Sequence, residues 1–469
     1  MNATAPSHDR IEALARDLAQ AIGEDAISRD HDTLAAHSGD WSEAQHHVPS
    51  LLIMPKTPET VAAALACCSR HRQPVVVQGG RTGLAGGATP QPGEVALSLH
   101  RLNQIEVLDE VAGTVQVQAG VVLETLQQHV EARGWYFPLD LGARGSCQVG
   151  GNASTNAGGN RVIRYGCMRE LTLGLEVALP DGRLLTMLNK VTKNTTGTEL
   201  RHIFIGSEGT LGVITRLVLK LVPLPASTVT ALCALPSFDA ATRLLKTLKR
   251  DMPGLSAFEL MWHSFMNASA EASRSALPFD RTYPVYALLE VQGANEAHDR
   301  EQLEAVIEQS FDDGTISDAI VAQSIADARR LWAYREAIGE LLGQMKPRAS
   351  FDIGIPISRM DDFVTVMHDR LSQRYPRQRH LFFGHLGDSN LHLMTGPYSG
   401  MHELEAVEGM VYQEVGNFGG SISAEHGIGV IKRDFLHYTR SPEEVAVMRD
   451  LKALFDPYGI LNPGRILRP

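Results

Sequence analysis

A long segment in the first half of the chain, residues 138–159, is rich in glycine, serine, threonine and asparagine and has neither helical nor strand periodicity. Its second part, from Ser146 to Gly159, holds two Gly-Gly pairs and no charged side chain. Such a segment is too polar to be core and too rich in glycine for a stable free-standing helix. A flexible linker is the ordinary alternative, but this composition favours a backbone that wraps closely around a large polar ligand.

The residues before this segment predict a β-α-β unit that ends at a glycine-rich loop. Thr57 and Pro58 predict the start of a helix that runs to Arg70, between two apolar strands. The loop, residues 79–87, lacks the Lys-Ser/Thr ending of a P-loop and opens no clear amphipathic helix. Its N–H groups can still form a concave anion site, to which Thr82 adds a hydroxyl donor. A purely structural glycine turn is the alternative.

Two short histidine motifs, residues 383–392 and 423–427, stand near the C-terminal end of the chain. Three of their side chains form the ligand set of a catalytic divalent-metal site with an open position, namely His385, His392 and Glu425. His426 would remain available as a base. The seven-residue offset between the histidines would put them on opposite faces of one strand, so the turn between them must fold the chain back. A single histidine is more often an ordinary polar residue at a strand end, but the whole group favours a metal site.

The second half of the chain predicts another domain, because Pro223 and Pro225 mark a boundary and residues 226–320 alternate strands with helices. This order suits an antiparallel sheet with helices on one face. A further helix is expected over residues 325–342, with Arg335 on its mainly apolar stripe. Arg335 could cover the core with its stem or clamp a carboxylate. The residues alone leave both possibilities open.

Composition excludes several classes of function. The formal net charge of −11 argues against non-specific binding to nucleic acid or to an anionic membrane. The five cysteines form no C-x-x-C pair, which indicates reduced thiols in a cytoplasmic protein. The N-terminal sequence lacks the basic-then-apolar order of a secretory signal. No run approaches the roughly 18 apolar residues of a membrane helix, so any membrane association, such as with the inner membrane, would be peripheral.

Taken together, four segments resemble the FAD-binding domain of the vanillyl-alcohol-oxidase superfamily: residues 79–87, 138–159, 206–212 and 461–465. The histidine motifs narrow the resemblance to the FAD-linked D-2-hydroxyacid dehydrogenases. That family includes D-2-hydroxyglutarate dehydrogenase, D-lactate dehydrogenase and the glycolate oxidase flavin subunit. The resemblance implies an α+β fold in three parts. The first is a two-subdomain FAD-binding domain of the PCMH type over residues 1–225, with its core over 46–225. The second is a substrate or cap domain over residues 226–420, made of an antiparallel sheet and helices. The third is a C-terminal helical segment over residues 421–469 that returns to the flavin.

The resemblance also implies FAD and the residues that hold it; the sequence gives no argument for a covalent link, so we expect a non-covalently bound cofactor. The pyrophosphate would lie in the loop made of Gly79, Gly80, Arg81, Thr82, Gly83, Leu84, Ala85, Gly86 and Gly87. The flavin and its ribityl chain would be lined by Pro138, Gly142, Ser146, Gly151, Asn152, Thr155 and Gly159. The adenine side would hold Glu208, Gly209, Gly212 and Ile214. Asn462 would reach back to the flavin.

For the reaction, the resemblance implies that zinc or a similar divalent ion is bound by His385, His392 and Glu425, and that His426 is the base. Arg335 matches the arginine that such enzymes use for the substrate carboxylate. The expected electron acceptor is an electron-transfer flavoprotein or a quinone, and a homodimer is expected. Two other readings are a flavin oxidase of aromatic or sugar alcohols, which needs no metal ligands, and a non-enzymatic flavoprotein or metal-storage module.

The chain departs from the D-2-hydroxyglutarate branch at three substrate positions. Ser350, Met394 and Gly339 stand where that branch has a lysine, an asparagine and a threonine. A pocket without these groups should bind a second carboxylate poorly, because a buried unpaired charge is costly. We therefore expect a monocarboxylic or apolar-tailed substrate such as D-lactate. D-2-hydroxyglutarate is the alternative, with Lys346 or Arg348 compensating.

Overall fold

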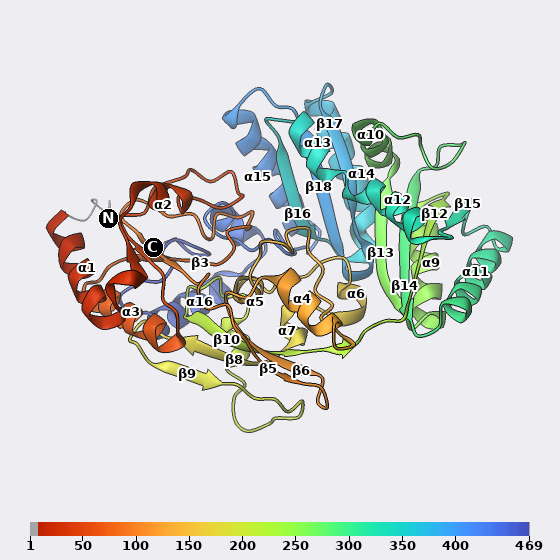
Figure 1. Ribbon diagram of the computed structural model, residues 1–469. Helices are drawn as coiled ribbons and strands as arrows, with labels where there is room; N and C mark the ends of the chain where they lie inside the picture. The colour runs from red at the N-terminus through yellow and green to blue at the C-terminus, as the bar shows by residue number, and fades with distance from the viewer. Residues whose placement is uncertain (1–7, 469) are drawn as a thin grey trace. The chain divides into compact units, whose positions relative to one another are not determined.

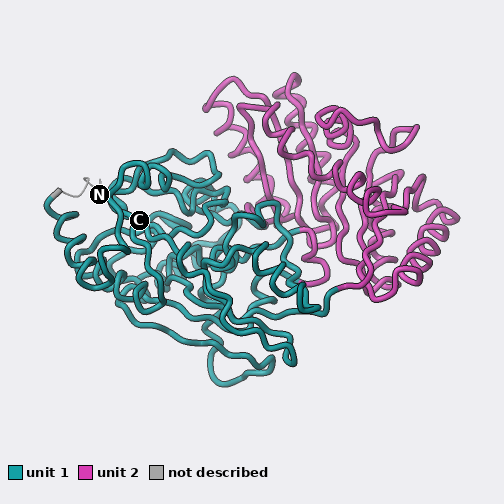
Figure 2. The backbone as a smooth tube through the Cα atoms, in the orientation of Figure 1, with its two compact units in different colours: residues 1–159, 166–224, 425–469 teal, residues 160–165, 225–424 magenta. Residues whose placement is uncertain are grey.

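The computed structural model describes residues 8–468, so the N-terminal residues that argued against a secretory signal lie outside its described part. The chain divides into two compact units, which Figure 2 colours separately. Unit 1 comprises residues 1–159, 166–224 and 425–469, and unit 2 comprises residues 160–165 and 225–424. Each unit is formed by segments that are distant in the sequence, and each builds its own sheets (Figure 1).

The first sheet of unit 1 has the strand order β1-β2-β4-β3. Its elements are β1 (Ile27–Ser28), β2 (Leu52–Ile53), β4 (Val95–Ser98) and β3 (Val75–Gln78), with helices α1 (His8–Ile22), η1 (Glu24–Ala26), α2 (His31–Ala36) and α3 (Pro58–Arg70). Thr57 caps α3 through a capping box with Thr60, as the sequence predicted. Strands β2 and β3 both pair in parallel with β4, which lies between them. The predicted β-α-β unit is therefore present, with a later strand inserted at its centre.

The second sheet of unit 1 is antiparallel, with the order β5-β6-β10-β8-β9. Its strands are β5 (Ile105–Asp109), β6 (Thr114–Gln118), β10 (Val213–Lys220), β8 (Thr172–Ala178) and β9 (Leu184–Met187), with helix α4 (Leu123–Glu131) and the small pair β7 (Trp135–Tyr136) and β11 (Val222–Pro223) beside it. The predicted hairpin of β8 and β9 is confirmed. The C-terminal segment adds η3 (Arg433–Tyr438) and α16 (Pro442–Phe455) to this unit.

The glycine-rich segment contains a helix that the sequence did not predict. Four short helices lie in or near it: α5 (Val149–Ser154), α6 (Val162–Tyr165), α7 (Met168–Leu171) and α8 (Arg201–Phe204). In α5, Val149 and Ala153 are fully buried, so the expectation that this segment is too polar for core is wrong. Tertiary packing offsets the poor helix propensity. A Cβ at Gly150 would lie only 2.5 Å from the Cβ of Ala119, so glycine lets α5 approach its neighbour closely.

Unit 2 is built on a seven-stranded antiparallel sheet with the order β15-β12-β14-β13-β17-β18-β16. Its strands are β12 (Ser227–Leu235), β13 (Leu255–Trp262), β14 (Val285–Gly293), β15 (Asp318–Val321), β16 (Ala349–Gly354), β17 (Arg379–His385) and β18 (Asn390–Gly396). The antiparallel sheet is as predicted, but β13 near its centre was not recognised from the sequence. The reason is that β13 is buried along most of its length, so it has no alternating pattern.

Helices cover both faces of this sheet, which corrects the expectation of one covered face (Figure 1). They are α9 (Phe238–Asp251), α10 (His263–Ser273), α11 (Glu296–Asp312), α12 (Ile325–Glu336), α13 (Ile338–Gln344), α14 (Ile357–Arg374) and α15 (Met401–Asn417). Met261 of β13 belongs to a core cluster with residues of α10, α12 and α13. The next residue, Trp262, points to the other face and stacks on Phe238 of α9 with ring centroids 6.0 Å apart. The predicted single helix over 325–342 is two helices, α12 and α13, which meet at Ala337.

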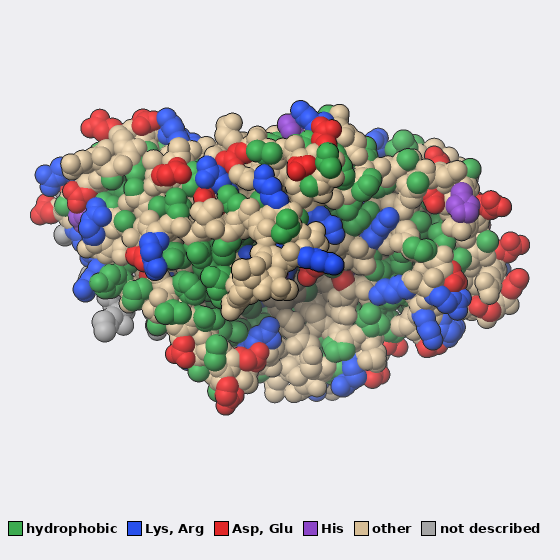
Figure 3. All heavy atoms as spheres, turned by 90° about the horizontal axis from the view of Figure 1, so that it is seen from below, with side chains coloured by type: hydrophobic (Ala, Val, Ile, Leu, Met, Phe, Trp, Pro, Cys, Tyr) green, Lys and Arg blue, Asp and Glu red, His purple; other side chains and the backbone are tan. Residues whose placement is uncertain are grey.

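Two general expectations concern the surface. Among the described residues, no helix combines the length and the apolar character that a membrane span requires. On the face drawn in Figure 3, acidic and basic side chains are interspersed. This mixture agrees with the charge argument against polyanion binding.

Candidate functional site

The glycine-rich segments of unit 1 are joined to one another through their backbones. The N–H of Gly206 donates to the carbonyl of Ala153 at 3.0 Å, and the N–H of Glu208 donates to that of Ser154 at 2.8 Å. The loop 206–212 is therefore fixed to α5. These contacts bring together two segments that the sequence assigned to one ligand.

The loop 79–87 lies against the same region. A Cβ at Gly80 would be 2.1 Å from the carbonyl oxygen of Ser146 and 2.9 Å from the Cα of Cys147, so only glycine fits there. A Cβ at Gly79 would be 3.8 Å from the Cα of Gly151. The loop thus packs backbone to backbone on residues 146–151.

The residues of the loop 79–87 differ in their exposure and in their hydrogen bonds. The guanidinium of Arg81 donates to the carbonyl of Ala36, and burial lowers its pKa. Leu84 is exposed, whereas Ala85 is buried and its carbonyl accepts the N–H of Val430 at 3.0 Å. Thr82 and Gly87 are half-buried, Gly83 is exposed and Gly86 is buried. Apart from Arg81, the loop therefore offers mainly backbone groups and one hydroxyl.

Asn462 ties the closing segment to these loops. Its side-chain oxygen accepts the N–H of Val77 at 2.8 Å, and its side-chain nitrogen donates to the carbonyl of Glu208 at 2.6 Å. A Cβ at Gly209 would lie 2.9 Å from that nitrogen. The amide of Asn462 therefore orders β3 and the loop 206–212, and its contact with a flavin stays a prediction.

Three non-glycine residues of the predicted cofactor set have a left-handed backbone. They are Arg81 (φ 56°), Glu208 (φ 51°) and Asn462 (φ 40°). Such conformations are uncommon for residues with a Cβ and tend to gather at ligand sites. All three belong to the interlocked loops, so their position supports a ligand-binding role for this region.

The carboxylate of Glu208 has partners that the sequence reasoning did not foresee. It accepts the N–H of Ile428 at 2.7 Å and that of Gly429 at 2.8 Å. Burial raises the pKa of Glu208, and these two N–H groups oppose that rise. The carboxylate of Glu208, which was expected at the adenine side, thus holds the segment that begins two residues after His426. The assignment of Glu208 to adenine stays a prediction.

Two buried polar atoms in the glycine-rich segment indicate what could fill the region. The Oε1 atom of Gln148 and the Oδ1 atom of Asn152 have no hydrogen-bond partner among residues 8–468. A Cβ at Gly142 or Gly151 would meet no atom within 4 Å. Buried polar atoms almost always have a partner, so these residues fit a large polar ligand such as FAD.

Packing explains two of the other predicted cofactor residues. A Cβ at Gly159 would lie 1.9 Å from the carbonyl oxygen of Asp140, and one at Gly212 would lie 2.5 Å from a methyl carbon of Val177. Both glycines are therefore required for packing. The remaining members are Pro138 and Ile214, which are buried, Ser146, which is exposed, and Thr155, whose hydroxyl donates to the carbonyl of Gly151 at 3.2 Å.

The two histidines of unit 2 lie on one face of a β-hairpin. Strand β17 ends at His385, the turn η2 (Leu386–Asp388) reverses the chain, and β18 pairs His392 with Phe383. The predicted fold-back is confirmed by this register. The imidazole rings of His385 and His392 have centroids 5.4 Å apart and planes at 80°.

Glu425 completes a group of three possible metal ligands. The ligand atoms that His385, His392 and Glu425 offer all lie within 4.8 Å of one another. Glu425 follows directly on Ala424, whose N–H donates to the carbonyl of Asp352 in β16 at 3.3 Å. Two imidazoles and one carboxylate suit a zinc-like ion with an open position, so the donor set fits the expected metal.

Glu259 is a member of this site that sequence reasoning missed. It lies opposite His385 in the β13–β17 register and is fully buried. Its Oε1 atom is 2.6 Å from Nδ1 of His385, and its Oε2 accepts the Nε–H of Arg335 at 2.7 Å. A carboxylate on Nδ1 leaves Nε2 of the imidazole as the ligand atom. The available signal was an acid inside the apolar sequence 255–262, a strand that was not recognised.

Charges around this hairpin shift two carboxyl groups in opposite directions. Burial raises the pKa of Glu259, but the charges of His385 and Arg335 outweigh it and hold the pKa below its usual value. Burial raises the pKa of Asp388 to about 6, with His385 opposing the rise and Glu259 adding to it. Glu259 therefore favours its ionised form and is hydrogen-bonded to the imidazole of His385.

Arg335 does not extend to solvent as a surface-covering arginine would. It is 5% exposed, and its guanidinium carbon lies 4.8 Å from the ring centroid of Phe383. Its Nη2 atom is 3.4 Å from Nε2 of His385. The side chain therefore belongs to the Glu259–His385 group, and its contact with a substrate carboxylate stays a prediction.

The three positions that were expected to select the substrate are only partly adjacent. Ser350 and Met394 lie opposite each other in the β16–β18 register, with Ser350 exposed and Met394 in the core. Gly339 is exposed in α13. Lys346 is exposed, and Arg348 donates to the carbonyl of Leu342 at 3.1 Å.

Asn390 is a second residue that sequence reasoning missed. It is 4% exposed, and neither polar atom of its side chain has a hydrogen-bond partner within the described part of the chain. It precedes His392 by two residues in β18, so both side chains point to the same face. A buried amide without a partner on this face can receive a polar ligand.

Comparisons with known proteins agree with this arrangement. Residues 224–466 match the C-terminal domain of FAD linked oxidases, and residues 49–188 match an FAD binding domain. The chain belongs to the FAD-linked oxidase family. Within it, the relatives described next place the chain among the FAD-linked D-2-hydroxyacid dehydrogenases, and FAD is its cofactor.

Relatives with this organisation are similar over nearly the whole chain. The mitochondrial D-2-hydroxyglutarate dehydrogenase of Bos taurus is 40% identical, over 94% of this chain and 81% of its own length. The D-2-hydroxyglutarate dehydrogenase of Stutzerimonas stutzeri is 36% identical, over 97% of this chain and 98% of its own length. A Schizosaccharomyces pombe protein named as a mitochondrial D-lactate dehydrogenase is 38% identical, over 93% of this chain and 85% of its own length.

Solved structures of low identity share the fold of this FAD-linked oxidase. A substrate-bound p-cresol methylhydroxylase aligns with a TM-score of 0.79 at 15% identity, over 98% of both chains. The 4-ethylphenol oxidase of Gulosibacter chungangensis aligns with a TM-score of 0.76 at 17% identity, over 99% of this chain and 98% of its own. The predicted α+β fold with a PCMH-type FAD-binding domain is therefore confirmed.

Proposed function

We propose that this FAD-linked enzyme oxidises a D-2-hydroxyacid to the 2-oxoacid, with His385, His392 and Glu425 holding a divalent ion and His426 acting as the base. The observation that carries the proposal is the group of three ligands within 4.8 Å, one of which is oriented by the buried Glu259. An orienting carboxylate behind a ligand histidine is typical of metal sites and has no evident use in an ordinary strand end.

The reaction requires the removal of a hydroxyl proton and of a hydride from the α-carbon. When held by the interlocked loops of unit 1, FAD would supply flavin N5 as the hydride acceptor. A divalent ion, when bound, makes the substrate hydroxyl more acidic. His426 then takes the proton, because the ring nitrogen of a neutral imidazole can act as a general base. Arg335 would pair with the substrate carboxylate.

The proposed FAD site combines the interlocked loops of unit 1. Successive N–H groups of residues 79–87 would receive the pyrophosphate, as glycine-rich loops do. The side-chain oxygens of Gln148 and Asn152 would accept hydrogen bonds from the flavin or its ribityl chain, and the cofactor is proposed as non-covalently bound. The domain limits at residues 225 and 420 are part of the same proposal.

For the substrate, we favour a monocarboxylic or apolar-tailed acid such as D-lactate. Met394 is packed in an apolar core cluster, Lys346 is exposed and Arg348 is bonded to a helix carbonyl. These facts support a substrate tail without a second charge. The names of several relatives favour D-2-hydroxyglutarate, which is the second candidate.

One set of variants distinguishes the two acids. The chain with Ser350→Lys, Met394→Asn and Gly339→Thr together should shift the ratio of kcat/KM from D-lactate toward D-2-hydroxyglutarate by about tenfold or more, because a buried charge gains a partner. Ser350→Gln, which adds length without charge, is the matched control. A natural chain that already prefers D-2-hydroxyglutarate strongly would contradict the D-lactate proposal.

The reaction class and the metal are tested together. Anaerobic addition of a panel of D-2-hydroxyacids should bleach the bound flavin with at least one acid, and metal analysis should find one divalent ion per active chain. Bleaching without a stoichiometric ion would contradict the proposed metal site and leave the proposed flavin reaction in place. Bleaching by an aromatic or sugar alcohol alone would favour the alcohol-oxidase alternative.

The proposal includes partners as well. An electron-transfer flavoprotein or a quinone would reoxidise the flavin, the chain would form a homodimer, and it would work in the cytoplasm. The proposed cytoplasmic location rests on the cysteine pattern of the sequence, which has no C-x-x-C pair. Flavin reoxidation by each acceptor in a stopped-flow experiment separates the two candidates.

A further inference from the structure

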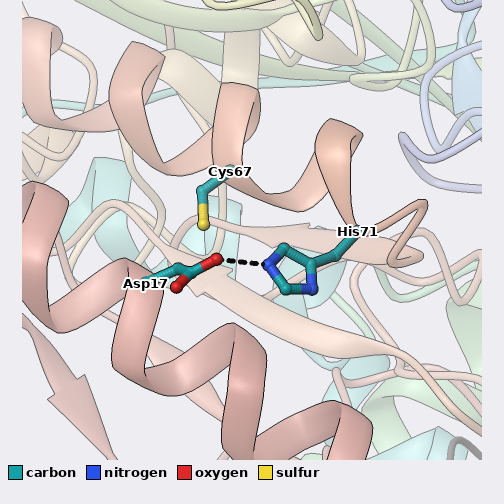
Figure 4. A group of neighbouring side chains, drawn as sticks. All are labelled: Asp17, Cys67 and His71. Atoms are coloured by element: carbon teal, nitrogen blue, oxygen red, sulfur yellow. Dashed lines mark hydrogen bonds and ion pairs between the residues drawn. The ribbon is translucent and has the colours of Figure 1, made fainter.

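A second group of possible metal ligands lies far along the sequence from the histidine hairpin, where helices α1 and α3 pack in unit 1 (Figure 4). It consists of Asp17 from α1, Cys67 from α3 and His71 at the C-terminal cap of α3. We propose that these three side chains bind a zinc-like transition-metal ion that fastens α1 to α3, independently of the catalytic reaction.

The spacing of the three residues suits one ion. Cys67 and His71 are four residues apart at the end of α3, so their side chains lie on the same side of the helix. The possible ligand atoms of all three residues lie within 4.8 Å of one another. Oδ2 of Asp17 is already 2.7 Å from Nε2 of His71. An ion needs only modest side-chain movement to contact one sulfur, one nitrogen and one oxygen.

The backbone around His71 is fixed by the same helix that carries Asp17. The Nη2 atom of Arg10 in α1 donates to the carbonyl of His71 at 2.6 Å and to that of Arg72 at 2.9 Å. Arg10 and Asp17 are seven residues apart, so both lie on the side of α1 that faces α3. The two helices therefore hold the ligand atoms in place before an ion arrives, which reduces the ordering that binding requires.

The chemistry of the group favours a metal over a reactive cysteine. One ring nitrogen of His71 is paired with Asp17, and Figure 4 shows the other directed away from Cys67. Neither nitrogen is therefore placed to deprotonate the thiol. The thiol is fully buried. A buried thiol that no base contacts is a poor nucleophile. It becomes a good ligand when a cation replaces its proton.

The donor set also indicates the kind of ion. A thiolate, an imidazole and a carboxylate together suit zinc or another borderline ion, and they suit magnesium or calcium poorly. The side chain of Asp17 is 49% exposed, which gives the ion an entry path and leaves a fourth position for water. On binding, the thiol releases its proton to solvent and the imidazole keeps its remaining hydrogen on Nδ1. The alternative is a simple Asp–His pair beside a structural thiol.

Cobalt is the probe that separates this site from the catalytic one. The purified holoenzyme is stripped with a chelator and titrated with Co²⁺, and the near-ultraviolet thiolate-to-cobalt band is recorded. His385, His392 and Glu425 contain no sulfur, so they cannot produce that band. The band should be present in the natural chain and in Cys68→Ala, whose thiol is the neighbouring buried one, and absent in Cys67→Ala.

A second measurement protects against loss of folding in the Cys67 variant. Zn²⁺ should raise the unfolding temperature of the stripped natural chain more than that of stripped Cys67→Ala, because both proteins keep the histidine site and only the natural chain has the thiol ligand. In Asp17→Asn, which changes a half-exposed side chain, the cobalt band should need about tenfold more Co²⁺ while flavin content and turnover stay unchanged. Absence of the band in the natural chain, or its persistence in Cys67→Ala, would overturn the proposal. Loss of this site leaves the proposed catalytic function intact, and the reverse also holds.

Discussion

The interlocked loops of unit 1 and the histidine hairpin of unit 2 are built from different chemical groups. The loops interlock through backbone N–H and carbonyl groups, and glycines such as Gly80 permit contacts that no side chain would allow. The hairpin presents imidazoles and carboxylates from regular strands, and Glu259 orients one of them. The loops should therefore be sensitive to added side-chain volume. The hairpin should be sensitive to the loss of particular functional groups.

The largest expected effect tests whether the chemistry depends on a side chain. His426→Ala should lower kcat by about 10²–10⁴-fold, because this change removes the proposed base for the hydroxyl proton. The measurement is the rate of anaerobic flavin reduction by the preferred hydroxyacid in a stopped-flow instrument. The flavin spectrum and unfolding temperature of the variant should match those of the natural chain. Near-normal reduction would remove His426 as the base.

Paired glycine substitutions test whether space decides the flavin site. Gly151→Ala should keep the fold, since its Cβ meets no atom within 4 Å, yet it should weaken FAD binding by about 1–3 kcal/mol by intruding on the flavin. Gly80→Ala should destabilise the apoprotein as well, because its Cβ would lie 2.1 Å from a carbonyl oxygen. Flavin content after gel filtration and thermal unfolding of the apoprotein are the two measurements. Full flavin retention by Gly151→Ala would contradict this assignment.

Glu259→Gln removes the charge behind the histidine hairpin and keeps the size of the side chain, so it tests whether chemical identity matters there. Loss of the charge behind His385 should lower metal affinity or activity by about 10–100-fold. The matched control is Glu290→Gln, another buried carboxylate of the same sheet, which is paired with Arg161 at 2.9 Å. The control should lower the unfolding temperature without changing metal content. Equal metal content in all three proteins would make Glu259 a purely structural partner of Arg335.

The smallest effect is expected at Asn390. Asn390→Leu should raise KM by an amount equivalent to about 0.5–1.5 kcal/mol if the amide binds substrate. The unfolding temperature should stay the same or rise, because the buried amide has no hydrogen-bond partner among residues 8–468. Steady-state kinetics and thermal unfolding are measured on the same preparation. A lower unfolding temperature with an unchanged KM would assign Asn390 to the fold instead.

The sequence alone determined those features whose signals are local. Thr57 and Pro58 gave the start of α3, and a proline-glycine turn gave the β8–β9 hairpin. The turn between His385 and His392 required the chain to fold back, and the structure contains that hairpin. Each of these rests on neighbours within a few residues, so a short window holds the complete signal.

The tertiary structure decided what depends on residues far apart in the sequence. Glu259 meets His385 only because β13 pairs with β17, and a fully buried strand has no alternation to reveal it. The short helix α5 exists because close packing against Ala119 outweighs the poor helix propensity of glycine. Asp17 reaches His71 only when α1 packs on α3. Local patterns state what each segment prefers, and long-range packing selects which side chains meet.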